Sequence, residues 1–468
     1  MSSPLKLVLD RDTKTSLTEQ IYLAIAGAIS AGVLAPGARL PSWRDLAAQL
    51  GVARGTVRAA YERLQDEQLI ESARARGTHV AERPQRIEKA AKPDYAQNAI
   101  PEAYREFSAG TGIFQMGVPA PDCFPAKLFA RIRARAVRAE LSALTYPDPR
   151  GDLELRREIA AHLAMSRSLE CVPSQIIVTA GFTGALGLIM RVLRSEGRSA
   201  WMEEPGFPLT RRALQIAQMK TVPIPVDANG LNVEEGLKRA PDAAVAVVTA
   251  GQQAPLGPTL SLSRRIALLD WAALSDGWII EDDYLGELQL KGRAAPALAS
   301  LDRAGRVIYV GSFSKTISPT LRLGFVVAPL QIAAKFDDAA TCLAPAPGPA
   351  VQRATAEFMR DGHFLRHLRR MKRVYASRRD DLESTLRPMG LSVGTAGLAI
   401  LLELPAGAED TRIAREATAF GLAPSPLSGW YSSRDHTRSG LLLGITTVPG
   451  NRLAASCEKL RNLIDQHG

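Results

Sequence analysis

Short apolar runs alternate with longer segments of helical periodicity from Phe107 onward, and few folds accommodate that order. The four clearest runs cover residues 176–178, 244–248, 278–280 and 307–310. Strands that alternate with helices predict a largely parallel sheet with helices packed against it. We therefore expect an α/β fold for this part of the chain.

The length of 468 residues exceeds what one hydrophobic core usually organises, so we expect two or three domains. Residues 82–106 mix three prolines with many alanines and show little apolar periodicity. This composition predicts a linker at 83–107. The linker would join an N-terminal domain at 14–82 to a larger domain at 108–467.

Charge and cysteine content narrow the class of protein. The formal net charge is +10, and the first 92 residues hold fourteen Lys and Arg against ten Asp and Glu. A basic excess attracts polyanions, although alone it is weak evidence. The four cysteines lie far apart, which predicts reduced thiols and no metal site. Neither a secretion signal nor a spanning apolar run is evident, so we expect a cytoplasmic protein.

The N-terminal domain shows three helical patterns followed by two short strands. The predicted helices cover 16–33, 43–50 and 54–67, and the predicted strands cover 69–72 and 78–81. Ser42 is placed to cap the second helix. Three helices and a small hairpin, with Arg74, Arg76 and Gly77 near its tip, predict a winged helix-turn-helix.

The second and third of these helices have the layout of a DNA-binding helix-turn-helix. Arg54, Thr56 and Arg58 fall in the first turns of the third helix, the part that reaches into a major groove. Guanidinium groups there can bind guanine edges or phosphates. Any one of these arginines is as readily a solvated surface residue, but the joint pattern favours DNA binding.

Residues 14–82 resemble the GntR family of winged-helix transcription regulators. The resemblance implies that double-stranded operator DNA is contacted by Arg44, Arg54, Thr56, Arg58 and Gly77. Ala53 stands where the family usually has Ser or Thr, and Gly55 is small for a recognition helix. These two departures bear on base preference more than on DNA binding itself.

Polar residues follow three of the apolar runs of the larger domain. Lys315 comes shortly after the run at 307–310, where it can be buried and deprotonated enough to form a Schiff base. Asp282 ends the run at 278–280 and suits a protonated pyridine nitrogen. Residues 177–184 predict a strand, a glycine turn and a helix start, which together suit an anion. Each feature alone has an ordinary structural explanation, such as a surface lysine or a helix cap.

The chain from about residue 108 to its end resembles the fold-type I aminotransferases. The resemblance rests on the motifs YPDPRG at 146–151, EPGFP at 204–208, EDDY at 281–284 and SFSK at 312–315. With the winged helix, the whole chain resembles the MocR and GabR-like branch of the GntR regulators. The resemblance implies a large α/β domain with a mainly parallel sheet, a smaller C-terminal α/β subdomain and pyridoxal 5'-phosphate as cofactor.

The same resemblance implies roles for individual residues. Lys315 would be the Schiff-base lysine that forms the internal aldimine, and Asp282 would pair with the pyridinium nitrogen. Tyr284 would lie near the phenolic oxygen, and Phe207 would stack on the ring. The phosphate would be bound by Ser312, Arg322, Gly181, Phe182 and Thr183. No metal is implied.

Two segments depart from the aminotransferase pattern. Gln252 stands where relatives usually have a histidine, and Ala254 stands where they have an aromatic residue, which would enlarge the pocket. The apolar run at 441–444 offers no arginine to clamp a substrate carboxylate. Arg434 and Arg438 lie just before it, but they are more readily surface residues. The Ser-x-x-Lys pattern at 312–315 also occurs in penicillin-interacting enzymes, whose companion motifs are absent.

Two functions fit these features. The first is a transcription regulator that senses a small amine, an amino acid or the cofactor itself through aldimine exchange at Lys315, a change that would reposition the winged helix on DNA. The second is a working aminotransferase with an accessory DNA-binding domain. The intact winged helix and the missing carboxylate arginine favour the regulator. The resemblance further implies a homodimer, and it leaves the effector open among γ-aminobutyrate, taurine, diamino acids and pyridoxal phosphate.

Overall fold

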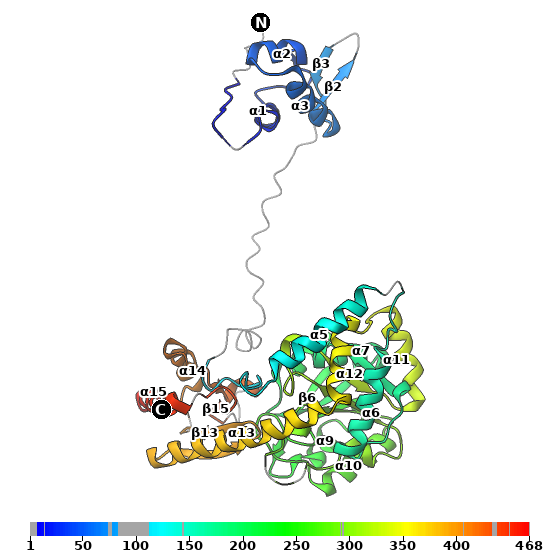
Figure 1. Ribbon diagram of the computed structural model, residues 1–468, viewed down its shortest axis with the longest axis vertical. Coiled ribbons are helices and arrows are strands. Elements are labelled where there is room, and N and C mark those ends of the chain that lie inside the picture. Colours follow the sequence, from blue (N-terminus) through cyan, green and yellow to red (C-terminus); the bar gives the residue numbers. More distant parts are fainter. Residues whose placement is uncertain are drawn as a thin grey trace. The chain divides into compact units, whose positions relative to one another are not determined.

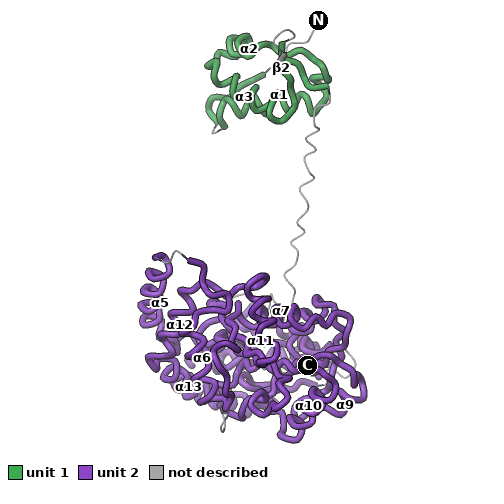
Figure 2. The backbone as a smooth tube through the Cα atoms, turned by 90° about the vertical axis from the view of Figure 1, so that its right-hand side faces the viewer, with its two compact units in different colours: residues 1–100 green, residues 101–468 purple. Residues whose placement is uncertain are grey.

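The computed structural model describes residues 7–13, 15–73, 77–82, 112–142, 145–290, 292, 294–405, 407–432, 438–448 and 450–467. The chain divides into two compact units, Met1–Ile100 and Pro101–Gly468 (Figure 2). The predicted linker at 83–107 lies outside the described residues, so its boundaries stay a prediction. None of the described helices is long and apolar enough to cross a membrane.

The first unit is a winged helix, as predicted. Its helices are α1 (Leu17–Ser30), α2 (Trp43–Leu50) and α3 (Arg54–Asp66), and its sheet has the order β1 (Arg39–Leu40), β3 (Gly77–Val80), β2 (Ile70–Ala73). Ser16 and Ser42 cap α1 and α2 by accepting hydrogen bonds from backbone amides one turn on. The two-residue strand β1 was not predicted, because so short a run carries no alternation of its own.

The second unit is built on an eight-stranded mixed sheet (Figure 1). Its strands, in spatial order, are β4 (Ile176–Thr179), β11 (Gly324–Val327), β10 (Val307–Ser312), β9 (Trp278–Asp283), β8 (Val245–Val248), β5 (Ser199–Glu204), β6 (Lys220–Asp227) and β7 (Gly230–Leu231). The five strands from β10 to β6 are mutually parallel, which confirms the prediction of a mainly parallel sheet. Strand β11 runs antiparallel to both of its neighbours.

Helices cover both faces of this sheet. They are α5 (Ala126–Leu141), α6 (Leu153–Arg167), α7 (Gly181–Leu193), α8 (Pro208–Ile216), α9 (Val233–Arg239), α10 (Leu262–Leu274), α11 (Leu330–Cys342), α12 (Pro349–Arg360) and α13 (His363–Leu386). Within β4, Ile177 packs with α7 and α11, whereas Ile176 and Val178 pack on the other face with α6 and α12. Burial on both faces explains why these strands are continuous apolar runs.

A smaller C-terminal subdomain completes the second unit. Its antiparallel sheet has the order β12 (Ser392–Ala396), β13 (Ala399–Glu403), β15 (Gly440–Gly444), β14 (Ser425–Pro426), and its helices are α14 (Asp410–Ala417) and α15 (Leu453–His467). Figure 1 shows the long helix α13 running from the large sheet to this subdomain. The α/β class and the two-part body match the predicted fold.

Candidate functional site

The sheet register brings the predicted site residues to one edge. Asp282 pairs with Val310 across β9 and β10, and Ser312 pairs with Gly324 across β10 and β11. Gly324 in turn pairs with Thr179 at the end of β4. Because β11 is antiparallel, its first residue lies beside the last residues of its neighbours. The residues that follow these ends, including Gly181, Tyr284 and Lys315, therefore start from the same edge, where open α/β sheets bind ligands.

The Lys315 side chain is half-buried at this edge. Its Nζ donates a 2.6 Å hydrogen bond to the carbonyl oxygen of Gly117. Burial lowers the pKa of Lys315 to about 8, because a charged ammonium loses its hydration, while the nearby Asp282 acts in the opposite direction. A substantial share of neutral amine near pH 8 makes this lysine a nucleophile.

The Asp282 carboxyl lies close enough to Lys315 for their charges to interact. Burial raises the pKa of Asp282 to about 8, together with smaller contributions from the negative charges of Asp283 and Glu203. Among the described residues, none donates a hydrogen bond to this carboxyl. A buried acid of this kind is stabilised in its charged form by a cation brought to it, as a protonated ring nitrogen would be.

The N-terminus of α7 and the Arg322 guanidinium lie together in the part of the site that the sequence predicts to bind an anion. Gly181 opens the helix with φ +74°, and Arg322 itself adopts φ +49°. The Arg322 Nη2 donates to Thr183 Oγ1 at 2.7 Å and to the carbonyl oxygen of Ala180 at 3.3 Å. The first backbone amides of a helix and a guanidinium are both donors that suit a phosphate.

Three predicted residues contribute rings and a hydroxyl near the same edge. Phe207 precedes α8, and its ring centroid lies 6.5 Å from that of Phe182 and 5.8 Å from that of Trp430. Burial raises the pKa of Tyr284, so its hydroxyl stays protonated and can donate. Ser312 Oγ accepts a hydrogen bond from the Ser314 amide at 3.2 Å. The cofactor-binding roles of these residues stay predictions.

A segment at 112–123, here called the strap, was not predicted as part of the site. Besides the Gly117 carbonyl, Val118 O accepts from Thr446 Oγ1 at 2.7 Å. Further along, Ala120 N donates to the Tyr375 hydroxyl at 2.8 Å. The strap therefore connects the Lys315 amine to α13 and to the end of β15. Its contacts span about 200 residues of sequence or more, and no local pattern marks them.

Glu203 was also missed. Its buried carboxyl accepts from Thr249 N, from Thr249 Oγ1 and from Gln253 Nε2, and it thereby holds the loop that follows β8. Burial raises the pKa of Glu203 to about 7. In the same loop, Gln252 Oε1 is buried and has no partner among the described residues. Ala254 packs in a cluster that includes Trp430. Strand β5 ends in two acidic residues, Glu203 and Glu204, just as β9 ends in acidic residues. This shared pattern could have identified Glu203 from the sequence.

A buried ion pair supports the loop behind Asp282. Arg167 Nε donates to Asp283 Oδ2 at 2.6 Å, and the Tyr309 hydroxyl donates to the same oxygen at 2.5 Å. Arg167 Nη1 also donates to the carbonyl oxygen of Ala295. These bonds hold the end of β9 at Asp283, the residue directly after Asp282, so they orient the Asp282 carboxyl indirectly.

The carboxylate-binding arginine of aminotransferases has no counterpart in β15. The strand reads GLLLG and is fully buried. Arg438, one of the two substitutes considered, forms an exposed ion pair with Glu403 at the end of β13. Arg434 lies outside the described residues. The structure therefore brings no described arginine of this segment to the site.

In the winged helix, the predicted DNA-contacting residues lie on exposed elements. Arg54 begins α3, and Arg58 pairs with Glu62 at 2.7 Å within that helix. Arg44 lies over the Trp43 ring, and Gly77 begins β3 with φ +80°. Arg74 and Arg76 lie outside the described residues. Arg39, which the sequence analysis did not name, lies close to Gly77 and adds a cation beside the wing. These DNA contacts stay predictions.

Comparisons with known proteins agree with both units. The family model "Aminotransferase class I and II" matches residues 117–417, and the model "Bacterial regulatory proteins, gntR family" matches residues 17–80. The chain is 34% identical to the "Probable rhizopine catabolism regulatory protein MocR" of Rhizobium meliloti over 97% of this chain and 95% of that protein. It is 34% identical to the "HTH-type pyridoxine biosynthesis transcriptional regulator PdxR" of Corynebacterium glutamicum over 82% of each chain.

A similar solved structure is that of LysN, an alpha-aminoadipate aminotransferase from Thermus thermophilus. It superposes with a TM-score of 0.70 at 26% identity, over 79% of this chain and 96% of that one. That structure was solved in complex with N-(5'-phosphopyridoxyl)-L-leucine.

Proposed function

The chain belongs to the GntR family of bacterial regulators, in its MocR type with an aminotransferase-like body, and on this premise we propose what it senses. The proposal is that the body holds pyridoxal phosphate at Lys315 and senses a small amine or amino acid by exchange of the amine joined to the cofactor. The winged helix would respond by a change in its binding to operator DNA. The half-buried Lys315 amine, which donates to the Gly117 carbonyl oxygen and has a lowered pKa, is the observation that carries the proposal.

The residues present fit the cofactor. When bound, pyridoxal phosphate supplies an aldehyde carbon with which a lysine amine or an effector amine can condense. Lys315 offers a half-buried amine that is partly neutral near pH 8. Asp282 offers a carboxyl without a hydrogen-bond donor among the described residues, which would hold a ring nitrogen proton. Arg322 and the N-terminus of α7 offer donors for a phosphate.

The effector would meet a pocket edge that differs from that of an aminotransferase. Gln252 presents a buried amide oxygen without a described partner, and β15 supplies no arginine. An amide oxygen accepts a hydrogen bond from an amine or hydroxyl, but it repels a carboxylate. We therefore expect the pocket to favour amines without an α-carboxylate over amino acids that carry one. We further propose a cytoplasmic homodimer that binds paired DNA half-sites.

Cofactor capture is the first test of this proposal. Purified chain mixed with pyridoxal phosphate should develop the absorbance band of a lysine-bound cofactor, and borohydride should fix the cofactor on the peptide that contains Lys315. The Lys315→Ala variant should do neither, while Lys335→Ala, an exposed lysine of α11, should behave as wild type. A colourless wild-type chain would contradict the proposal.

The rival function, a working aminotransferase, makes a different prediction. A single turnover with an amino acid would then convert bound cofactor to pyridoxamine phosphate and release a keto acid. A sensor should instead shift the absorbance and stop there. The keto acid can be measured by mass spectrometry, and full turnover would favour the rival.

A further inference from the structure

Helix α13 carries a group of arginines that the candidate site does not use. Arg366, Arg369, Arg370 and Arg373, here called the arginine array, occupy positions i, i+3, i+4 and i+7 and so share one face of the helix. All four are exposed, whereas the opposite face of α13 packs into the core of the body. The array is a surface feature and does not line the cofactor site.

The charge of the array is poorly neutralised. Neither Arg369 nor Arg373 has a hydrogen bond or an ion pair with any residue that the structure describes, and Arg370 donates to a backbone oxygen, that of Asp122. Residues 363–379 of α13 contain no Asp or Glu. Like charges at this spacing repel and destabilise a helix. An anion placed over the array would remove that cost.

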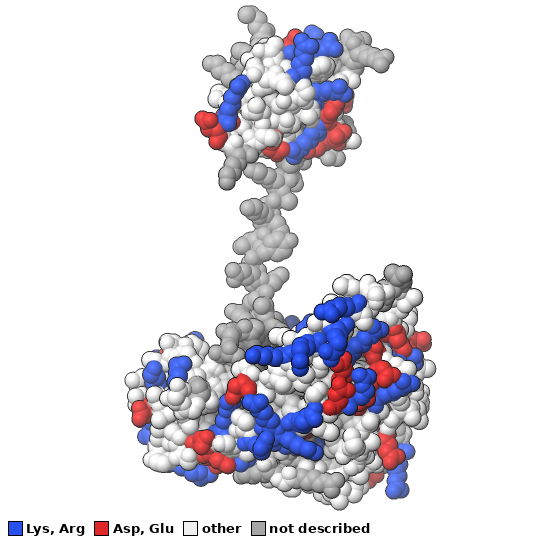
Figure 3. Space-filling model, in the orientation of Figure 1, with Lys and Arg blue, Asp and Glu red and all other residues white. Residues whose placement is uncertain are grey.

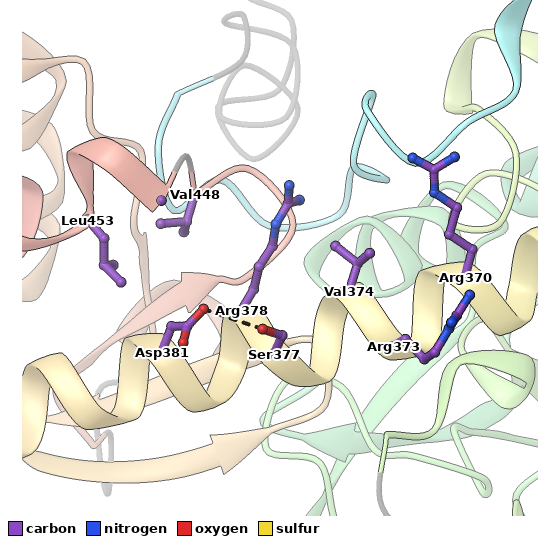
Figure 4. Close-up of a pocket in the computed structure, with 9 residues that line it drawn as sticks. Arg370, Arg373, Val374, Ser377, Arg378, Asp381, Val448 and Leu453 are labelled. Carbon is purple, nitrogen blue, oxygen red and sulfur yellow. Dashed lines mark hydrogen bonds between the residues drawn. The ribbon is translucent and has the colours of Figure 1, made fainter.

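The surface around the array is hollowed and basic. A cavity of about 560 Å³ is lined by three arginines and one acidic residue, Asp381, together with Ser377 and with apolar residues of α13 and of 448–453. The arginines are Arg370, Arg373 and Arg378. Figure 4 shows the Arg370 and Arg378 side chains projecting from α13 on the side of this cavity. The space-filling view shows basic side chains gathered over α13 and again over α5 (Figure 3). On α5 they are Lys127, Arg131, Arg133, Arg135 and Arg138, all exposed.

We propose that the arginine array is a second DNA-contacting surface, which binds backbone phosphates of a duplex without reading its sequence. This inference rests on the proposed function, because the winged helix of the same chain would bring a duplex to a high local concentration near the body. From residue 366 to 373 the array extends about 10 Å along the helix. A duplex presents one phosphate about every 3.4 Å of axis on each strand, so the array can meet about three phosphates.

A polyanion fits this surface better than a small anion does. The arginines point outward along a helix face rather than converging on one buried point, and they repeat in one dimension as phosphates do. Guanidinium groups bind phosphate oxygens by two parallel hydrogen bonds, which favours arginine over lysine at such contacts. Non-specific contacts of this kind add affinity that depends strongly on salt.

The test is the salt dependence of DNA binding by the full-length chain. A variant with Arg366, Arg369, Arg370 and Arg373 all changed to Gln would be titrated with a labelled 40-base-pair duplex of mixed sequence at several salt concentrations. If three phosphate contacts are lost, the slope of log K against log salt should become shallower by about 2.7. Between 50 and 200 mM salt, wild-type affinity should then fall about 40-fold more than that of the variant.

A control variant removes the same charge elsewhere, with Arg212, Lys220, Arg303 and Lys335, all exposed, changed to Gln. It should keep a slope within about one unit of wild type. Cofactor absorbance and circular dichroism would show that both variants are folded. If the array variant has the same slope as the control, the inference is wrong.

A second outcome would also overturn the inference. If the array variant changes the sedimentation coefficient of the free protein, the surface is a contact between copies of the chain. Wild-type protein that binds no duplex would contradict the proposed function itself.

Discussion

Lys315 and Asp282 each have a pKa displaced far from its value in water. Burial lowers the pKa of the lysine and raises that of the carboxyl, so both approach about 8 from opposite sides. Their mutual attraction opposes both shifts, but burial is the larger effect. A cofactor that brings a ring nitrogen proton to the carboxyl and an aldehyde to the amine would relieve both.

Cofactor capture should therefore depend on pH through the Lys315 amine. Below pH 8 the amine is mostly charged, and the neutral fraction rises about tenfold per pH unit until it levels off above the pKa of about 8. Stopped-flow absorbance at constant pyridoxal phosphate should show that rise and plateau. A rate that increases steadily up to pH 10 would indicate an amine with the pKa of an ordinary lysine.

Replacing Asp282 should change how stability depends on pH in the cofactor-free chain. Because the pKa of Asp282 is higher in the folded chain than in the unfolded chain, folding takes up a proton between about pH 4 and pH 8. Wild-type stability should fall as pH rises through that window, and Asp282→Asn should remove more than about 1.4 kcal/mol of the fall. Urea unfolding at pH 5 and pH 8 measures this. Asp242→Asn, at an exposed acid, should leave the fall unchanged.

At the scale of single elements, the N-terminus of α3 differs from those of the other two helices of the winged helix. Helix α3 begins after Ala53, whose side chain makes no capping hydrogen bond, whereas α1 and α2 are both capped by serines. The recognition helix is thus the one helix of the winged-helix unit, within residues 7–73, that begins without a side-chain cap. Its backbone at the cap, with φ −60° and ψ 140°, already suits a serine.

Ala53→Ser should therefore stabilise the winged helix by about 1 kcal/mol, because the hydroxyl can accept from a free amide of the first turn. The measurement is the unfolding transition of this unit in urea. Ala53→Val has no acceptor and should give no gain. Equal stabilisation by serine and valine would show that side-chain capping is not the cause.

Tyr375 connects the strap to the core of the body. Its hydroxyl accepts a hydrogen bond from the Ala120 amide. Its ring projects from α13 and is fully buried in the core of the body. Tyr375→Phe should leave that amide without its partner and destabilise the body by about 1–3 kcal/mol. If the strap positions Lys315 through Gly117, the variant should also shift the pH midpoint of cofactor capture, a change that loss of stability alone would not cause. An unchanged midpoint would limit Tyr375 to a structural role.

For the whole molecule, the two units have separate hydrophobic cores. The winged-helix core contains described residues from 7 to 80, and the cores of the body begin at Ile113. Each unit can therefore bury its apolar surface without residues of the other. A ligand of the body should act on the stability of the body first.

Calorimetry should show two unfolding transitions, and pyridoxal phosphate should raise the midpoint temperature of the one that belongs to the body. At 100 times the dissociation constant, the cofactor should add about 2.7 kcal/mol to the stability of the body. Lys315→Ala should reduce that gain in stability. The midpoint temperature of the winged-helix transition should not change with cofactor in either the wild type or the variant. One transition that moves as a whole with cofactor would mean that the units unfold together.

Much of the architecture follows from local sequence patterns. The apolar runs predicted β4, β8, β9 and β10, and helical periodicity predicted α1 and α2, the second of them with its Ser42 cap. These patterns are readable because backbone hydrogen bonds and burial on a given face repeat at a fixed period along the chain. The order of Asp282, Tyr284, Ser312, Lys315 and Arg322 was equally visible, since each follows the end of a strand or turn.

Tertiary structure decided what those residues contact. The antiparallel direction of β11 places Gly324 beside Ser312 and Thr179, and no property of residues 324–327 indicates that direction. The Gly117 carbonyl that accepts the Lys315 hydrogen bond is 198 residues away in sequence, and Glu203 reaches Thr249 across 46 residues. Such contacts depend on the path of the whole chain rather than on local propensity. The sequence predicted that Lys315 can lose its proton, whereas the raised pKa values of Asp282 and Glu203, which arise from burial and from distant neighbours, could not be predicted from it.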